Sequence, residues 1–396
     1  MSRGATGVLQ WRPGRVAILT SAIYLATLGL CLTRSSLSFG ALIHVGRNFV
    51  SADCTLYGVP VFPGGGYDGQ FFYRLALEPR YRDDRICPRL DAPAYRQQRI
   101  LYPFMVWALS FGEKHVVPFL LVAVNFVFVT VLGWVGAKSA TQAGRPAYWG
   151  LLLACYPGFL FSILHDTPEP IGATLLVGSL FALRIGKPIL ACVALVFGVL
   201  VRESLVPAAI VIAGVWAWGV REKGGVSNKS GLKDMLRWWV GILPVVAFLT
   251  WQTALAMKWR QLAFIQGRRN VAIPVLGTVG ALWESMHPFG KASSTFDLAL
   301  LAGLIMSAII GVSVLKGGIS PVHEKVAFAV YGIAALSLGT PVWEYRGGFL
   351  RALSEFYALS FLLITSSRWR FGHMLLGYWI ALFIGSAVGY CLMGGR

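Results

Sequence analysis

The sequence predicts an all-α polytopic membrane protein, on the strength of three observations. Of the 396 residues, 56% are hydrophobic and only 13% are charged, about half the charged fraction of a soluble domain. Apolar runs long enough to cross a bilayer recur along almost the whole chain. The lysines and arginines lie mostly in the gaps between those runs, as they do in membrane proteins. We therefore expect a single transmembrane domain over residues 1–396.

About eleven transmembrane helices are expected from the lengths of the apolar runs. The first span, 16–36, follows several arginines and resembles a signal peptide. No clear A-x-A cleavage site comes after it, so we expect an uncleaved anchor helix. The other spans are expected at 116–137, 146–164, 171–186, 188–201, 204–220, 236–257, 298–315, 324–341, 350–367 and 374–393.

The distribution of charge predicts the orientation. With a cytoplasmic N-terminus, the short loops that are rich in lysine and arginine are all cytoplasmic, in agreement with the positive-inside rule. The two long loops, 37–115 and 258–297, then face outward. Of the 17 acidic residues, only Glu222, Asp234 and Glu324 remain on the cytoplasmic side. Since acids contribute little to orientation, this bias suggests a site at the outer face, although ordinary solvated loop charge is the better explanation for most of the outer acids.

Several classes of function are disfavoured. The net charge of +18 would suit nucleic-acid binding, but its placement between spans fits membrane orientation and anionic lipid better. The sequence has no Walker loop, no GxGxxG after a predicted strand and no zinc-type Cys/His cluster. We therefore expect no nucleic-acid partner, no nucleotide site and no cofactor. The loop 258–297 alternates basic and apolar residues, so we expect it to lie on lipid head groups without a catalytic role.

The stretch GGGYDGQFFYRLALEP (64–79) contains the first candidate for catalysis, Asp68. Its glycines allow a turn that can push a side chain into a cleft. The aromatic residues that follow suit a helix at the membrane interface. A carboxylate held there can take a proton from an incoming hydroxyl. The alternative is that Asp68 caps the helix that follows it.

A second group of acids lies in LHDTPEPIG (164–172), where one span ends on the outer side and the next begins. Asp166 and Glu169 are expected near Asp68, where they would bind acceptor hydroxyls or, as a weaker alternative, a divalent cation. Acids are also favoured at the start of any helix by its dipole, which is the structural explanation for the same residues.

Arginines that can hold a phosphate occur in two more outer segments. In LVRESLVP, Arg202 and Glu203 are expected in a broken, inward-dipping hairpin or a plain turn, because a charged pair within lipid would be unfavourable. In WEYRGGFLRALSEFYAL (343–359), Arg346 and Arg351 lie at the outer start of the tenth span. Their guanidinium groups can bind a phosphate through paired hydrogen bonds. Snorkelling to the interface is the alternative, and it suits Arg346 better than Arg351.

Together these motifs resemble the GT-C superfamily of integral-membrane glycosyltransferases, most like the GPI mannosyltransferase II (PIG-V-like) branch and related bacterial membrane proteins. That family has an outer loop of the form W-D-x-x-x-Y-x-x-I-A, which YDGQFFYRLA (67–76) matches with tyrosine replacing tryptophan. RQQRILYPFMVWAL (96–109) fits an F-x-P-L-Y-P-type segment through Tyr102 and Pro103. The acidic turn, the interrupted hairpin and a late outer arginine occur in the same order. The turn reads Asp-Thr-Pro-Glu rather than Ser-Glu, and the glycine after the hairpin arginine is absent.

The resemblance implies an inverting glycosyltransferase of a bacterial inner (plasma) membrane. It would move a monosaccharide from a polyprenyl-phosphate donor to a glycan, lipid or cell-surface polymer on the outer face. Asp68 would deprotonate the acceptor hydroxyl, and Arg202, Arg351 or Arg346 would neutralise the departing lipid phosphate. The residues expected to bind acceptor or sugar are Tyr67, Gln70, Tyr73, Arg99, Tyr102, Asp166, Glu169 and Glu203.

Two other classes stay open. A lipid or polysaccharide transporter or flippase would line a pathway with the same charges, although no clear internal repeat of the kind that transporters show is present. A polysaccharide ligase or polymerase would take a lipid-linked oligosaccharide instead of a monosaccharide donor.

Cys54 and Cys87 are the cysteines outside the predicted spans, and they flank the Asp68 motif in one outer loop. We predict a disulfide between them on the oxidising side of the membrane, the alternative being two unrelated thiols. The other cysteines, Cys31, Cys155, Cys192 and Cys391, fall in apolar helices and are expected to be free, buried thiols.

Overall fold

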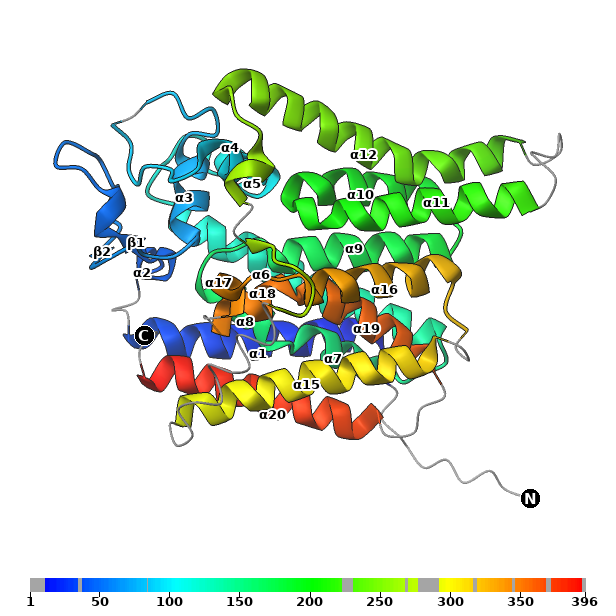
Figure 1. Ribbon diagram of the computed structural model, residues 1–396. Helices are drawn as coiled ribbons and strands as arrows, with labels where there is room; N and C mark the ends of the chain where they lie inside the picture. Colours follow the sequence, from blue (N-terminus) through cyan, green and yellow to red (C-terminus); the bar gives the residue numbers. More distant parts are fainter. Residues whose placement is uncertain are drawn as a thin grey trace.

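The chain folds into a helical bundle with a small cap at one end (Figure 1). The computed structural model describes residues 11–34, 38–83, 85–222, 231–267, 270–276, 292–315, 319–343, 346–367 and 372–393. The cap is formed by residues 38–83 and 85–116, and therefore corresponds to the first predicted outer loop. The bundle is formed by the helices that follow the cap together with the first helix.

The elements of the cap are short. They are α2 (Gly40–Ile43), β1 (Val45–Gly46), the 3-10 turn η1 (Arg47–Phe49), β2 (Val61–Phe62), α3 (Gly69–Leu77), α4 (Pro93–Gln97) and α5 (Leu101–Leu109). The two strands pair in parallel, Val45 with Val61 and Gly46 with Phe62.

The helices of the bundle follow the predicted spans. They are α1 (Pro13–Arg34), α6 (Val117–Gln142), η2 (Ala147–Trp149), α7 (Gly150–Ala154), α8 (Pro157–Leu164), α9 (Glu169–Arg184), α10 (Pro188–Val201), η3 (Glu203–Leu205), α11 (Val206–Glu222), α12 (Gly231–Trp259), α13 (Ala263–Gly267), α15 (Ala292–Val314), α16 (Val322–Leu336), α17 (Thr340–Trp343), α18 (Arg346–Ala352), α19 (Ser354–Thr365) and α20 (Gly372–Met393).

These helices make the chain a helical membrane protein. Within the described residues, five helices are long and apolar enough to cross a membrane: Pro13–Thr33, Val117–Gln142, Trp238–Trp259, Thr295–Val314 and Gly372–Cys391. A bent pair, Ala147–Ala154 with Pro157–Leu164, makes a sixth if it is counted as one span. The remaining predicted spans coincide with helices of 17 residues or fewer, which are short for an upright crossing.

The predicted span 146–164 is broken rather than continuous. Its two halves, α7 and α8, meet at an angle of 54°. Pro157 explains the break, because proline lacks an amide hydrogen and disfavours the helical conformation in the residue before it. Tyr156 accordingly has an extended backbone, with φ −69° and ψ 123°.

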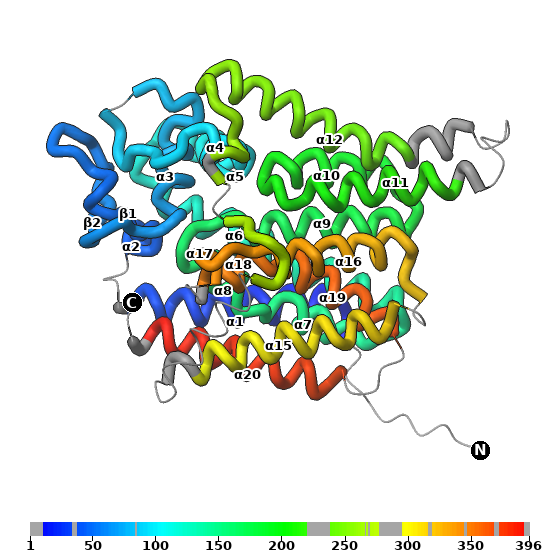
Figure 2. Tube along the Cα trace, in the orientation of Figure 1, coloured from blue at the N-terminus to red at the C-terminus, as the bar shows by residue number. Residues whose placement is uncertain are grey.

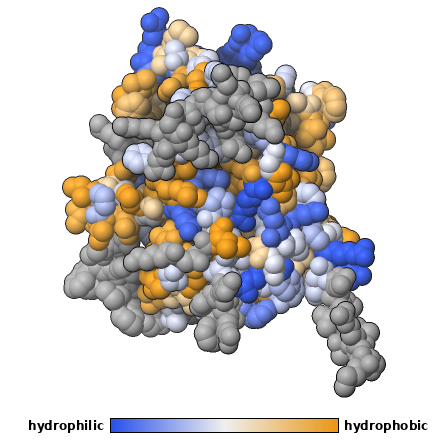
Figure 3. All heavy atoms as spheres, turned by 90° about the vertical axis from the view of Figure 1, so that its right-hand side faces the viewer, coloured by the Kyte–Doolittle hydropathy of each residue, from blue (hydrophilic) through white to orange (hydrophobic). Residues whose placement is uncertain are grey.

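The first and last helices lie side by side. α1 packs against α20, and both run through the same side of the bundle (Figure 2). On the other side, α10 packs between α9 and α12, and α11 packs against α12 (Figure 1). The end of the bundle away from the cap shows hydrophilic residues interspersed with hydrophobic ones (Figure 3). This mixture suits a surface in contact with water.

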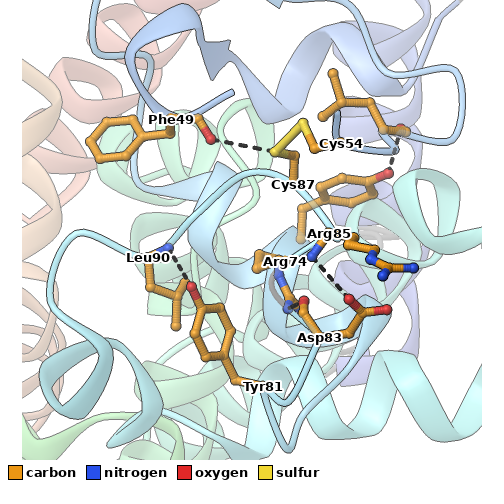
Figure 4. Close-up of a disulfide and its surroundings, with 10 residues drawn as sticks. Phe49, Cys54, Arg74, Tyr81, Asp83, Arg85, Cys87 and Leu90 are labelled. Carbon is orange, nitrogen blue, oxygen red and sulfur yellow. Dashed lines mark hydrogen bonds between the residues drawn. A yellow bond between two sulfur atoms is a disulfide. The ribbon is translucent and has the colours of Figure 1, made fainter. Parts of the chain in front are cut away.

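Two disulfides lie at the capped end. The predicted bridge between Cys54 and Cys87 is confirmed, with Cα atoms 5.6 Å apart, and Figure 4 shows it beside the carbonyl of Phe49. The prediction of free thiols at Cys31 and Cys391 is wrong, because a second disulfide joins them over a separation of 360 residues. This second bridge follows from packing, since α1 and α20 end side by side near the cap.

Thiol counting should reveal this pattern. Of the six cysteines, only Cys155 and Cys192 are free, and both are buried. We expect alkylation of the denatured, unreduced chain to modify two thiols, and alkylation after reduction to modify six. Four modified thiols before reduction would mean that one bridge is absent, and peptide mapping would identify which one.

Helix α3 does not lie at a membrane surface as expected. All nine of its residues are buried, in contact with α5, α4 and α6. The aromatic residues that suggested an interfacial helix instead form the interior of the cap, where Phe72 and Tyr73 belong to one apolar cluster with Val106 and Leu121. Aromatic residues fit both places, because each offers a large apolar surface.

Candidate active site

Asp68 stands at the start of α3, but its side chain does not cap that helix. It occupies the N-cap position without a capping hydrogen bond, so the capping explanation is wrong. Instead, Oδ1 accepts a hydrogen bond from Nη1 of Arg96 at 2.9 Å, and Oδ2 accepts one from Nη1 of Arg351 at 3.1 Å. The side chain is 32% exposed, so the carboxylate remains accessible from the adjoining cavity.

Two glycines allow the turn before Asp68 and its docking on the bundle. Gly66 has φ +64°, and a Cβ atom there would lie 2.4 Å from the carbonyl oxygen of His44. At Gly69, a Cβ atom would lie 2.2 Å from the carbonyl oxygen of His165. Both distances are far below van der Waals contact, so only glycine permits the close backbone approach.

Asp68 faces a cavity of about 470 Å³ between the cap and the bundle, a volume typical of small-molecule sites. Its lining comes from the cap, from the α9 and α10 ends, from the segment after α13 and from α17 and α18. The lining residues are Phe49, Gly65, Gly66, Tyr67, Asp68, Gln70, Phe71, Asp91, Tyr95, Arg96, Arg99, Glu169, Arg202, Asn270, Pro341, Val342, Gly348, Arg351 and Ala352. Of the residues predicted for the site, the cavity therefore brings together Tyr67, Asp68, Gln70, Arg99, Glu169, Arg202 and Arg351.

Arg351 and Arg202 form a buried ion-pair network on the bundle side. Nε of Arg351 donates to Oε1 of Glu169 at 3.1 Å, and the same oxygen lies 3.8 Å from Nη2 of Arg202. Nη1 of Arg202 pairs with Oε1 of Glu355 at 2.8 Å. Both glutamates are 1% exposed at the side chain. Because buried charges need partners, each group fixes the position of the next.

The predicted break at Arg202 is confirmed. α10 ends at Val201, and Arg202 has an extended backbone with φ −149° and ψ 125° before η3 and α11 follow. Glu203 points to another partner, since both of its carboxylate oxygens accept hydrogen bonds from Arg99. This pair joins the bundle to the α4–α5 segment of the cap.

Arg96 is a site residue that sequence reasoning missed. Its Nε and Nη2 each donate to Asp91 at 2.8 Å, and its guanidinium lies 4.0 Å over the ring of Phe71. Asn270, in the second predicted outer loop, also lines the cavity although we expected no functional role there. The match of RQQRILYP to a family motif was the available signal, because Arg96 is its first residue.

Asp68 remains ionised in this setting. Burial raises its pKa, but the guanidinium groups of Arg96 and Arg351 outweigh that effect and hold the pKa well below its usual range. The carboxylate is therefore ionised and able to accept a proton, but it is a weak base while both arginines hold it.

Other predicted site residues support the fold instead of lining the cavity. The Tyr73 hydroxyl donates to the carbonyl of Leu56 at 2.7 Å, and that of Tyr102 donates to the carbonyl of Leu121 at 2.9 Å. Gln70 lines the cavity, but its amide oxygen accepts a hydrogen bond from the backbone N–H of Gly46, and its amide nitrogen donates to the carbonyl of Gly65. The side chain of Arg346 lies outside the described residues.

Asp166 is fully buried, and neither of its carboxylate oxygens has a hydrogen-bond partner among the described residues. It does not line the cavity, so the prediction that it contacts an acceptor is not supported. Its backbone is left-handed, with φ 51°, a conformation that asparagine tolerates as well as aspartate. Within the described part of the chain, no three His, Cys, Asp or Glu side chains are grouped to hold a metal ion.

An Asp166→Asn variant should be more stable than the wild type at pH 8. Burial raises the pKa of Asp166 well above its usual range, so the wild type loses stability as pH rises above the unfolded pKa of about 4. Asparagine removes that pH-dependent loss, which grows by about 1.4 kcal/mol for each pH unit between the unfolded and the folded pKa. Thermal unfolding in detergent at pH 5 and pH 8 would measure it. An equal change at both pH values would contradict the explanation.

No protein family, curated protein or solved structure matched this chain in the comparisons with known proteins.

Proposed function

We propose that this chain is a GT-C-like glycosyltransferase of a bacterial inner membrane, which transfers a monosaccharide from a polyprenyl phosphate to an acceptor hydroxyl on the outer face. One observation supports it most: a single cavity holds an ionised aspartate, Asp68, beside Arg351 and Arg202 at the capped end of a membrane bundle. Such a site can accept a proton and stabilise an anionic leaving group at once.

The chemistry follows from these positions. The acceptor hydroxyl gives its proton to Asp68, and its oxygen forms a bond to the anomeric carbon. The bond from that carbon to the phosphate oxygen breaks on the opposite side, which inverts the configuration. The electron pair leaves with the lipid phosphate, and its growing charge is stabilised by Arg351, with Arg202 behind it.

The cavity also offers the surfaces that a sugar needs. Phe49, Phe71, Tyr67 and Tyr95 contribute aromatic faces or edges, and Asn270 contributes an amide that can donate and accept hydrogen bonds. Apolar walls with a few fixed polar groups are typical of small-molecule sites. The cavity therefore has both the charged and the aromatic components of a lipid-linked sugar site.

A reconstituted assay tests the proposal. The purified chain would be given short-chain polyprenyl-phosphate monosaccharides that differ in the sugar, together with a panel of alkyl glycoside acceptors. Acceptor-dependent release of polyprenyl phosphate, with formation of a glycoside of inverted configuration, is the expected result. Movement of intact donor between liposome leaflets without cleavage would identify a transporter instead. Turnover only of oligosaccharide-linked donors would identify a ligase or polymerase.

A further inference from the structure

We infer that the two oxygens of Asp68 have different roles, and that the donor phosphate releases one of them by taking over Arg351. This inference rests on the proposed function, because it describes how the base of that reaction becomes reactive. Oδ1, held by Arg96, positions the carboxylate. Oδ2, held by Arg351, is the oxygen that receives the proton.

Arg96 is held through all three of its guanidinium nitrogens. Each of its three guanidinium nitrogens donates to a carboxylate, Nε and Nη2 to Asp91 and Nη1 to Asp68. Its flat face is covered by Phe71 at 4.0 Å. Its two bonds to Asp91 form a bidentate pair, which is a strong geometry for an arginine. An incoming phosphate would have to displace Asp91 to bind Arg96. Arg96 therefore stays on Oδ1 throughout, as a positioning residue.

Arg351 is held less completely. Its Nε donates to Glu169, while Nη1 is shared between the Tyr67 hydroxyl at 2.9 Å and Oδ2 of Asp68 at 3.1 Å. Its Nη2 makes no hydrogen bond with any described residue, and Arg351 lines the cavity. A phosphate can engage Nη1 and Nη2 together through two oxygens. The single bond to Asp68 cannot match that paired geometry.

The charges around the cavity favour this competition. Among the described lining residues are four arginines, which are already paired with Asp68, Asp91, Glu169, Glu203 and Glu355. A phosphate that binds any of these four arginines therefore weakens an existing pair. The Asp68–Arg351 pair is the most exposed of those on the bundle side, because Asp68 is 32% exposed whereas Glu169 is 1% exposed.

The switch fixes the order of events. While Arg351 holds Oδ2, the carboxylate is too weak a base to activate an acceptor. When the donor phosphate draws Arg351 away, Oδ2 loses its neutralising partner and takes up protons more readily. Oδ1 remains on Arg96, so the freed oxygen stays aimed into the cavity. Acceptor deprotonation thus follows donor binding.

A binding measurement tests the competition directly. The purified full chain in detergent would be titrated with farnesyl phosphate, a lipid phosphate without a sugar, by calorimetry. We expect Asp68→Asn to bind it about tenfold more tightly than the wild type, because the competing carboxylate charge is gone. Asp53→Asn is the control: it removes the same charge from an exposed side chain of the cap that does not line the cavity. Its affinity should stay within about twofold of the wild type.

The outcomes separate this inference from the proposed function. Equal tightening in both variants would reduce the effect to net charge and overturn the switch. No tightening in Asp68→Asn, or no binding by the wild type, would also overturn it. If the wild type transfers sugar but the variants do not show the predicted order of farnesyl phosphate affinities, only the switch is rejected. If the affinities follow the predicted order but no sugar is ever transferred, the competition for Arg351 stands and the role of Asp68 as a base is rejected.

Discussion

Replacing Asp68 by asparagine should lower sugar transfer by a factor of about 10² or more. The amide is nearly the same size, and its one oxygen can still accept a hydrogen bond from Arg96, but its NH2 group cannot accept the bond from Arg351. It cannot take a proton from the acceptor hydroxyl, so the loss falls on the chemical step. Single-turnover transfer, measured at saturating donor, isolates that step from binding and product release.

Two controls decide whether that loss is chemical. Farnesyl phosphate binding should be retained by Asp68→Asn, which shows that the cavity is intact. Asp91→Asn, which loosens only the support of Arg96, should lower transfer much less. Transfer by Asp68→Asn at the wild-type rate would remove Asp68 from the mechanism, and an equal loss in Asp91→Asn would point to electrostatics of the whole cap.

Long apolar runs made the bundle predictable. The helices α1, α6, α12, α15 and α20 lie close to their predicted spans, because length and hydropathy alone determine a crossing helix. The same pattern failed at Pro157, where an unbroken apolar run concealed a bend. It also failed to show that α3 is buried, since aromatic residues suit both a lipid interface and a protein interior.

The site was predictable only in part, for a related reason. Glu169, Arg202 and Arg351 could be singled out because a charge at the end of an apolar span is conspicuous. Asp68 lies in the middle of the first outer loop, and it was singled out by the glycines before it and the aromatic residues after it. Arg96 and Asp91 were not singled out, because they are two charges among many in a polar loop and the motif match at 96–109 depended on Tyr102 and Pro103. Tyr73 and Tyr102 matched a motif but face away from the cavity, and no pattern of residue types shows which side of a short helix is buried.

Breaking the ion pair between Arg184 and Glu324 should destabilise the fold by about 3–5 kcal/mol, the usual effect of leaving a buried charge unpaired. Nε of Arg184 donates to Oε1 of Glu324 at 2.6 Å, and Nη2 donates to the other oxygen and to the Ser366 hydroxyl. The side chains are 8% and 0% exposed. The pair joins the end of α9 to the start of α16, and both residues were predicted on the cytoplasmic side, opposite the cavity. A Glu324→Leu variant should therefore unfold at a markedly lower temperature in detergent.

A double variant distinguishes charge from packing at this position. Arg184→Met combined with Glu324→Leu leaves no buried charge, and such replacements of whole buried pairs are often neutral or stabilising. The double variant should therefore recover most of the stability that Glu324→Leu loses, and farnesyl phosphate binding should be unaffected because Arg184 and Glu324 do not line the cavity. If the double variant were as unstable as the single one, the loss would come from the shape of the α9–α16 contact. The ion pair would then hold the two helices in register without contributing to stability through its charge.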